Sequence, residues 1–343
     1  MSASANPMTP ERPEQLAGSR LDPAATATED SSARSINPQG SGRFAPSPTG
    51  DLHLGNLRTA ILASAWARAT GRRCVLRVED LDRVRAGSTE RQLEQLAQLG
   101  LHYDGEVLIQ TSRHAAHLAA LDTLANKGHL FECFCSRKDI REAASAPHTP
   151  PGHYPGTCIG LTEDERAQKR EEFARQGRQP ALRFRAPVDT WEIFDELHGN
   201  YTGPVDHVVL RRNDGAIAYN LAVVVDDAFQ GVDQVTRGDD LLSQAPTQAC
   251  LGSALGLPQP IYVHVPLALN EKGERLAKRD GAVTLPQLTE LGVEIPQIIG
   301  AIAQSLGLGE QVGAARSLEE LLDVLDYETL KRMPLEPWVF SGI

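Results

Sequence analysis

Long apolar runs and cysteines are both scarce in this sequence of 343 residues. The longest apolar runs, such as residues 221–225, are far shorter than the ~20 residues that a membrane-spanning helix needs, so we expect no membrane protein. Five cysteines are too few for a disulfide-stapled fold, and their odd number favours a reducing compartment.

Basic residues are also in deficit, since 34 Lys and Arg stand against 45 Asp and Glu, for a net charge of −11. This balance argues against a protein that coats DNA, although it leaves room for one basic groove that binds a single RNA. A hydrophobic fraction of 41% and a charged fraction of 23% are ordinary for a globular protein and exclude collagen and coiled coils. The length predicts about two domains, or one domain with an insertion.

Residues 1–42 hold almost no large apolar side chains, and they lack the basic start and apolar core of a signal peptide. Such a segment cannot bury enough surface to offset the entropy lost on ordering. We therefore expect a disordered leader on a cytoplasmic protein.

Helix and strand signals alternate after the leader. The patterns predict a helix over residues 54–70, a strand over 74–79, a helix that begins with a Thr89–Gln92 capping box, and a helix over 112–127. This alternation is typical of an α/β domain built on a Rossmann-like, doubly wound parallel sheet.

The alternation of helix and strand signals stops over residues 130–205. These residues hold three of the cysteines and a charged stretch with a Thr162–Glu165 capping box. We interpret this part as an inserted α+β subdomain that carries a solvated helix. A hairpin around residues 213–215 and a strand over 261–265 follow it. The expected parts are the leader (1–42), the two halves of the α/β domain (43–129 and 206–283), the insertion (130–205) and a short helical C-terminal segment (284–343).

The densest motif is Arg43-Phe44-Ala45-Pro46-Ser47-Pro48-Thr49-Gly50-Asp51-Leu52-His53-Leu54-Gly55-Asn56. It predicts a strand end, a turn fixed by prolines, and a helix start that carries His-x-Gly. A helix N-terminus binds phosphate through its free N–H groups and its dipole. His53 can donate a hydrogen bond to that phosphate, and Gly55 lets a flat base approach the backbone.

This segment resembles the HIGH signature of class I aminoacyl-tRNA synthetases, in the form used by glutamyl-tRNA synthetases. His53-Leu54-Gly55-Asn56 stands in place of the tetrad, and the flanking Phe-Ala-Pro-Ser-Pro-Thr-Gly is the more specific part. The resemblance runs from about Gly42 to Ala282. It implies a Rossmann-like catalytic domain and a site for ATP with Mg²⁺ that includes His53, Gly55 and Asn56.

A second motif is Arg275-Leu276-Ala277-Lys278-Arg279-Asp280-Gly281-Ala282, which alone predicts only a basic loop. Its position resembles the KMSKS loop of the same family, in which a lysine stabilises the charge on the phosphate during adenylate formation. The resemblance makes Lys278 an ATP-binding and catalytic residue together with His53. Arg275 replaces the first lysine of the motif and Ala277 replaces its serine, so the charge is kept and a hydroxyl is lost.

A glutamate substrate carries two carboxylates and an ammonium, so its site needs guanidinium groups and an acid. Four segments resemble glutamate-specific synthetases, namely RFAPSPTG, VLRVEDLD, AYNLAVVVDD and VTRGDDLL, although VVVDD alone favours a buried strand. The resemblance implies a glutamate site with Glu79 facing the ammonium. The implied lining is Arg43, Phe44, Ala45, Pro46, Ser47, Glu79, Tyr219 and Arg237.

Three cysteines in the expected insertion can form an incomplete zinc shell, which normally has four ligands. His148 and His153 are chemically the more obvious fourth ligands. The pattern Cys133-Phe134-Cys135 with Tyr154-Pro155-Gly156-Thr157-Cys158 also resembles the zinc-binding insertion of glutamyl-type synthetases. That resemblance implies one structural Zn²⁺ held by Cys133, Cys135, Tyr154 and Cys158.

The chain beyond Gly281 is too short for the helical anticodon-binding domain of glutamyl-tRNA synthetases. The resemblance therefore implies a truncated member that activates L-glutamate with ATP in the absence of tRNA and esterifies it onto queuosine in the anticodon of tRNA(Asp). The alternatives are a compact enzyme that charges tRNA(Glu), a catalytically inactive RNA-binding paralogue, and a small nucleotidyltransferase of the HIGH superfamily.

The implied partners are ATP, L-glutamate and the anticodon stem-loop, without DNA or membrane, and we expect a monomer. Since the net charge is negative, the basic residues should gather at the mouth of the active site to hold the RNA. The candidates for this role are Arg43, Arg58, Arg237, Lys278 and Arg279.

Overall fold

The computed structural model describes residues 39–82, 84–136, 138–140, 153–276, 283–308 and 317–342. The first strand, β1, spans Ser41–Phe44 and so includes two residues that the sequence placed in the leader. Residues 1–38 lie outside the described part of the chain.

A seven-stranded sheet with the order β3-β2-β1-β9-β10-β6-β7 organises the fold. Neighbouring strands are parallel except β6 and β7, which pair antiparallel at one edge. The first five strands follow the doubly wound order, in which the direction of winding switches between β1 and β9. The predicted Rossmann-like sheet is thereby confirmed. Besides β1, its strands are β2 (Arg73–Val78), β3 (Leu108–Ile109), β6 (Thr190–Asp195), β7 (Gly199–Pro204), β9 (Val232–Gly238) and β10 (Ile261–Val265).

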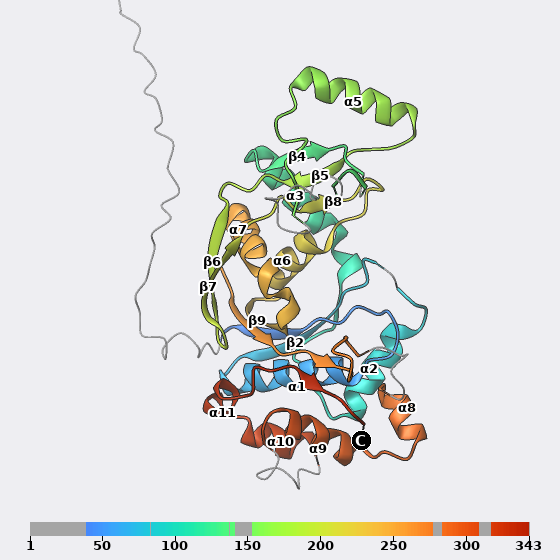
Figure 1. Cartoon of the computed structure of the whole chain (residues 1–343), viewed down its shortest axis with the longest axis vertical. Coiled ribbons are helices and arrows are strands. Elements are labelled where there is room, and N and C mark those ends of the chain that lie inside the picture. The colour runs from blue at the N-terminus through green and yellow to red at the C-terminus, as the bar shows by residue number, and fades with distance from the viewer. Residues whose placement is uncertain are drawn as a thin grey trace, which may run out of the picture. The chain divides into compact units, whose positions relative to one another are not determined.

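Helices cover both faces of this sheet. Figure 1 shows α1 and the C-terminal helices on one face and α3, α6 and α7 on the other. No helix in the described ranges has the length and apolar character needed to cross a membrane. The helices of the sheet domain are α1 (Leu54–Ala69), α2 (Ser88–Gln98), α3 (His114–Asn126), α6 (Tyr219–Phe229) and α7 (Ala245–Leu255), with 3₁₀ turns η1 (Gln110–Arg113) and η2 (Asp239–Gln244).

Helix α1 is buried nearly all round because the C-terminal helices cover the side that faces away from the sheet. Trp66 of α1 and Ile298, Ile299 and Ile302 of α9 belong to one apolar cluster, and all four are fully buried. A helix with apolar residues on every side requires such a sandwich. The C-terminal elements are α8 (Leu285–Glu290), α9 (Ile295–Ser305), α10 (Leu318–Val324), α11 (Tyr327–Lys331) and strand β12 (Trp338–Val339), which pairs parallel with β11 (Ala268–Leu269).

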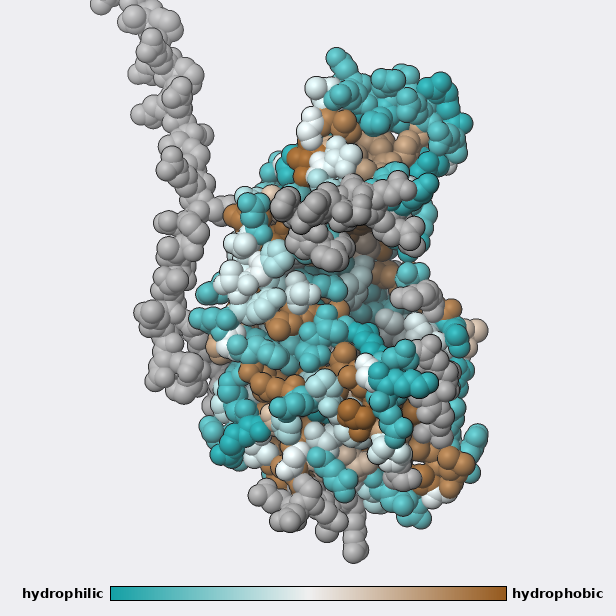
Figure 2. Space-filling view, in the orientation of Figure 1, coloured by the Kyte–Doolittle hydropathy of each residue, from teal (hydrophilic) through white to brown (hydrophobic). Residues whose placement is uncertain are grey.

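A second, antiparallel sheet of three strands carries the cysteine-rich part of the chain. It consists of β4 (Leu130–Cys133), β5 (Ala181–Phe184) and β8 (Val209–Arg211). Helix α5 (Glu163–Arg175) has no buried residue, and Figure 2 shows a hydrophilic surface over it. Its predicted Thr162–Glu165 capping box is present, so the solvated helix is confirmed.

The partition between the two sheets differs from the expected boundaries. β6 and β7 lie within residues 130–205, yet they extend the main sheet through the β6–β10 pair. β8 lies beyond residue 205, yet it pairs with β5 in the small sheet. Local alternation of apolar and polar residues predicts that a strand forms, whereas its partner depends on tertiary packing.

Two local predictions are wrong. The predicted Thr89–Gln92 capping box does not form, because Gln92 donates to the backbone oxygens of Ser47 and Gly50. Helix α2 begins at Ser88, after Gly87, without a side-chain cap. The VVVDD segment forms part of helix α6, although it favours a strand by itself. Burial of both its faces between the sheet and α7 overrides the preference of β-branched residues for strands.

Candidate active site

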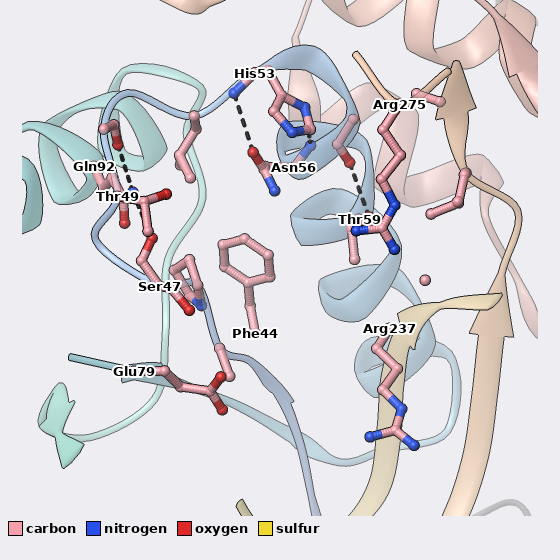
Figure 3. A pocket seen from close by; sticks show the side chains of 18 of the residues that line it. Phe44, Ser47, Thr49, His53, Asn56, Thr59, Glu79, Gln92, Arg237 and Arg275 are labelled. Atoms are coloured by element: carbon pink, nitrogen blue, oxygen red, sulfur yellow. Dashed lines mark hydrogen bonds between the residues drawn. The ribbon is translucent and has the colours of Figure 1, made fainter. Parts of the chain in front are cut away.

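A cavity of about 840 Å³ opens where β1 and β9 end, at the switch point of the sheet (Figure 3). Ligands of doubly wound folds bind in the crevice at this place. Every described residue that the sequence assigned to ATP or glutamate lines this cavity. These residues are Arg43, Phe44, Ala45, Pro46, Ser47, His53, Gly55, Asn56, Glu79, Tyr219 and Arg237.

His53 is the N-cap of α1 and faces the cavity. Its Nδ1 accepts a hydrogen bond from the backbone N–H of Asn56 (3.3 Å), and the Asn56 Oδ1 accepts one from the backbone N–H of His53 (3.2 Å). Because Nδ1 accepts, the proton of the neutral ring lies on Nε2. A Cβ atom at Gly55 would lie 3.1 Å from two atoms of the His53 ring, so a side chain at this position would crowd the ring.

The imidazole of His53 is held in its neutral form. Burial, together with the nearby charge of Arg275, lowers its pKa from 6.5 to about 4. A neutral ring that is fixed through Nδ1 offers its Nε2 proton to an anion at neutral pH. The N-terminus of the 16-residue helix α1 adds its own positive potential at the same place.

The segment of Lys278 lies outside the described residues, but both of its flanks are at the rim of the cavity. Before it, Arg275 lines the cavity and pairs with Asp240. After it, Val283 accepts a hydrogen bond from the Leu54 N–H (2.9 Å), and Thr284 forms a bridge with His53.

Two buried guanidinium groups share one carboxylate beneath the cavity. Asp227 Oδ1 accepts from Arg43 Nε (3.2 Å) and from Arg77 Nη1 (2.7 Å), while Arg77 Nη2 donates to Glu79 (3.1 Å). Burial alone would raise the pKa of Asp227, but Arg77 and Arg43 outweigh it and hold that pKa below its usual value. Burial raises the pKa of Glu79 against the opposing effect of Arg77 and Arg43.

Arg77 and Asp227, which belong to this network, are not among the site residues expected from the sequence. Arg77 lies two residues before Glu79 and so shares its face of the strand, which is a signal that could have found it. Asp227 lies in the VVVDD segment, which by itself favours a buried strand, so its place in the network does not follow from the sequence. Thr236, in the second half of β9, also lines the cavity and accepts from Arg43 through its backbone oxygen.

Arg58, one of the cations expected at the mouth of the active site, does not line the cavity. Arg58 is 1% exposed and donates to the Pro266 oxygen and to Ser305 Oγ, so it is an interior residue. Burial lowers its pKa to about 10. Arg43 and Arg237 are also buried, and Lys278 and Arg279 lie outside the described residues. Among the described lining residues, Arg85 and Arg275 are the exposed guanidinium groups.

A cluster of thiols in the cysteine-rich part can bind a metal ion. The Sγ atoms of Cys133, Cys135 and Cys158 all lie within 4.8 Å of one another. Tyr154 Oη lies 3.5 Å from Cys133 Sγ and 3.7 Å from Cys135 Sγ. The hydrogen bond between Cys133 and Cys158 lowers the pKa of Cys158 to about 6 and raises that of Cys133 to about 12, so it favours the thiolate, the form that binds metals, at Cys158 only.

The cavity, the capped helix and the sheet order together define a doubly wound α/β fold with a ligand site at its switch point. The chain belongs to the family "tRNA synthetases class I (E and Q), catalytic domain", which it matches over residues 41–340. It is therefore a ligase.

Similar proteins fall within the same family. The chain is 55% identical to a "Glutamyl-Q tRNA(Asp) synthetase" of Nocardia farcinica, over 88% of this chain and 93% of that relative. A protein of the same description from Cutibacterium acnes is 46% identical, over 78% of this chain and 76% of that one. A glutamate tRNA ligase from Elizabethkingia meningosepticum, solved in complex with its amino acid, superposes with a TM-score of 0.72 at 25% identity, over 88% of this chain and 67% of that chain.

We predict that the imidazole of His53 titrates near pH 4. Its folded-state pKa is lowered, so the unfolded chain binds the extra proton first, and stability falls as the pH drops from about 6.5 to about 4. Nuclear magnetic resonance of the histidine rings, with the His53 signal assigned through a His53→Asn variant, measures the midpoint. A midpoint near pH 6.5 would contradict the buried, neutral ring.

Proposed function

We propose that the protein activates L-glutamate with ATP in the absence of tRNA and transfers it to queuosine in the anticodon of tRNA(Asp). The observation that carries this proposal is the meeting, in one cavity, of a capped helix N-terminus with the buried charges of Arg43, Arg237 and Glu79. The two relatives described as glutamyl-Q tRNA(Asp) synthetases support the choice of substrate and acceptor.

The charges of the cavity complement glutamate. Figure 3 shows Glu79 on one side of the cavity and Arg237 on the other, with Ser47 on the side of Glu79 and Phe44 between the two sides in this view. A substrate with an ammonium and two carboxylates can bring its positive end to Glu79 and a negative end to Arg237. Since these groups are buried, each ion pair is screened little by water and discriminates strongly against an uncharged side chain.

The triphosphate of ATP fits the other end of the cavity. There the N–H groups of α1, the Nε2 proton of His53 and the guanidinium of Arg275 present positive potential. Lys278 would add its charge from the adjoining segment, and Mg²⁺ would accompany the phosphates. In the first step a carboxylate oxygen of glutamate forms a bond to the α-phosphorus and pyrophosphate leaves. In the second step a hydroxyl of queuosine displaces AMP and an ester forms.

We also propose that the thiol cluster holds one structural zinc ion with Cys133, Cys135, Tyr154 and Cys158 as ligands. Zinc–sulfur bonds of about 2.3 Å in a tetrahedron separate two sulfurs by about 3.8 Å. The 3.6 Å between Cys135 Sγ and Cys158 Sγ is close to this spacing. His153 is the weaker candidate for fourth ligand because its Nδ1 faces Asp206 at 3.9 Å, and His148 lies outside the described residues.

We predict that His53→Ala and Lys278→Ala each reduce glutamate-dependent ATP–pyrophosphate exchange by about two to three orders of magnitude, because each removes a donor to the charge that develops on phosphate. The exchange is measured without tRNA, and circular dichroism verifies that both variants remain folded. Exchange near the wild-type rate in both variants would show that His53 and Lys278 are not catalytic residues.

We predict that the acceptor is the modified anticodon base. An anticodon stem-loop of tRNA(Asp) with queuosine should accept labelled glutamate, and the same loop with guanine should not. With the whole tRNA, the label should survive removal of the 3′-terminal adenosine. If the label is lost with that adenosine, the protein is instead a compact glutamyl-tRNA synthetase.

We predict one zinc ion per chain by metal analysis. Tyr154→Phe should weaken zinc binding in a chelator competition by at least ~10-fold, since even indirect partners of a metal contribute 10- to 100-fold. His153→Ala is the matched control and should bind zinc like the wild type. If His153→Ala weakens zinc binding and Tyr154→Phe does not, His153 is the fourth ligand.

A further inference from the structure

Arg237 is fixed in the wall of the cavity by neutral groups. The side chain is buried, with the residue 5% exposed, and its nitrogens make three hydrogen bonds. Nε donates to His264 Nε2 (3.0 Å), Nη1 to Gln248 Oε1 (2.6 Å) and Nη2 to the Leu241 backbone oxygen (3.3 Å). In the described part of the chain no carboxylate lies within ion-pair distance of this guanidinium.

This pattern differs from that of the other buried arginines at the site. Arg43 and Arg77 both pair directly with Asp227. A guanidinium has five N–H groups, so the three bonds of Arg237 leave one on Nη1 and one on Nη2. A buried cation with unused N–H donors and no acidic partner destabilises the protein unless an anion binds to it.

His264 is itself held in one orientation and one tautomer. Because its Nε2 accepts from Arg237, its proton lies on Nδ1 and is donated to Asp195 Oδ2 (2.7 Å). Burial lowers the pKa of His264 to about 4, so the ring is neutral. The ring also stacks on Tyr262, with centroids 5.6 Å apart and planes 13° from parallel.

Asp195 has no freedom to move away from His264. Its Oδ1 accepts from the backbone N–H groups of Leu197 (2.9 Å) and His198 (3.0 Å), and its Oδ2 accepts from the backbone N–H of His264 (3.0 Å) as well as from the ring. Asp195 and His264 are both fully buried.

We propose that His264, oriented by Asp195, is a positioning residue that holds Arg237 in place for a carboxylate of the amino-acid substrate. The imidazole supplies an acceptor that fixes the guanidinium without neutralising it. The negative charge of Asp195 remains one ring away, so the positive charge of Arg237 stays directed at the cavity. This inference rests on the proposed activation of glutamate.

Two substitutions of His264 separate the contact to Arg237 from the contact to Asp195. In His264→Gln the amide reaches the position of Nε2, so it can still accept from Arg237. In His264→Asn the amide reaches only the position of Nδ1, so the contact to Asp195 is kept and that to Arg237 is lost. Tested by tRNA-free exchange, His264→Asn should raise the KM for glutamate by roughly 10-fold or more, with the KM for ATP unchanged. His264→Gln should stay within about 3-fold of the wild type, as expected when the hydrogen bond is retained.

A third variant tests whether Arg237 must lack an acidic partner. Gln248→Glu keeps the shape of the side chain but places a carboxylate on Nη1. It should therefore raise the KM for glutamate by roughly 10-fold or more although Arg237 remains fixed, again with the KM for ATP unchanged.

An unchanged KM for glutamate in His264→Asn and Gln248→Glu would overturn the inference. So would an equal rise in the KM values for glutamate and ATP with a lowered Tm, since that is the effect of a merely structural residue. Failure of the proposed function is distinct, because the wild-type protein would then show no glutamate-dependent exchange at all.

Discussion

The shared carboxylate of Asp227 is the interaction on which the site depends. It joins Arg43 on β1 to Arg77 on β2 from helix α6, so three elements distant in sequence meet at one atom. Without it two buried guanidinium groups would repel each other, and leaving a buried charge unpaired costs about 3–5 kcal/mol. With it, Arg43 and Glu79 are fixed before any ligand arrives, and preorganised charges of this kind are those that contribute most to catalysis.

The extension of the main sheet by β6 also fixes a charged group of the cavity before a ligand binds. Asp195 is the last residue of β6, and its pairing with Tyr262 of β10 places it beside His264, two residues further along β10. The long connection between the first and second halves of the α/β domain thus returns to the sheet as β6. There it places the buried carboxylate of Asp195 next to His264, which in turn contacts Arg237. The cavity draws on β1, β2, β9 and, through His264, on β10 and β6.

The sequence predicts much of this arrangement because motif residues lie at strand ends and helix starts, where local patterns are strong. The parallel sheet and the helix that begins after His53 follow from such signals, whereas the residues that line the cavity follow from the resemblance to glutamyl-tRNA synthetases. Asp227 and His264 do not, since a buried polar residue is recognised only through partners that the chain brings from far away. For the same reason Arg58 was placed at the surface, although its partners Pro266 and Ser305 enclose it.

The thiol cluster is connected to the cavity by contacts with the segment that leads into helix α6. Tyr154 donates its backbone N–H to Asp206, and Arg183 lies over the Tyr154 ring while it donates to the His207 oxygen. From residues 206 and 207 the chain continues into β8 and a hairpin and then directly into α6, which begins with Tyr219. A metal ion that fixes the cluster would therefore help to place the start of α6 and with it the lining residue Tyr219. With the four proposed protein ligands such an ion would have no open position for catalysis, so it would act on the reaction only by placing this helix.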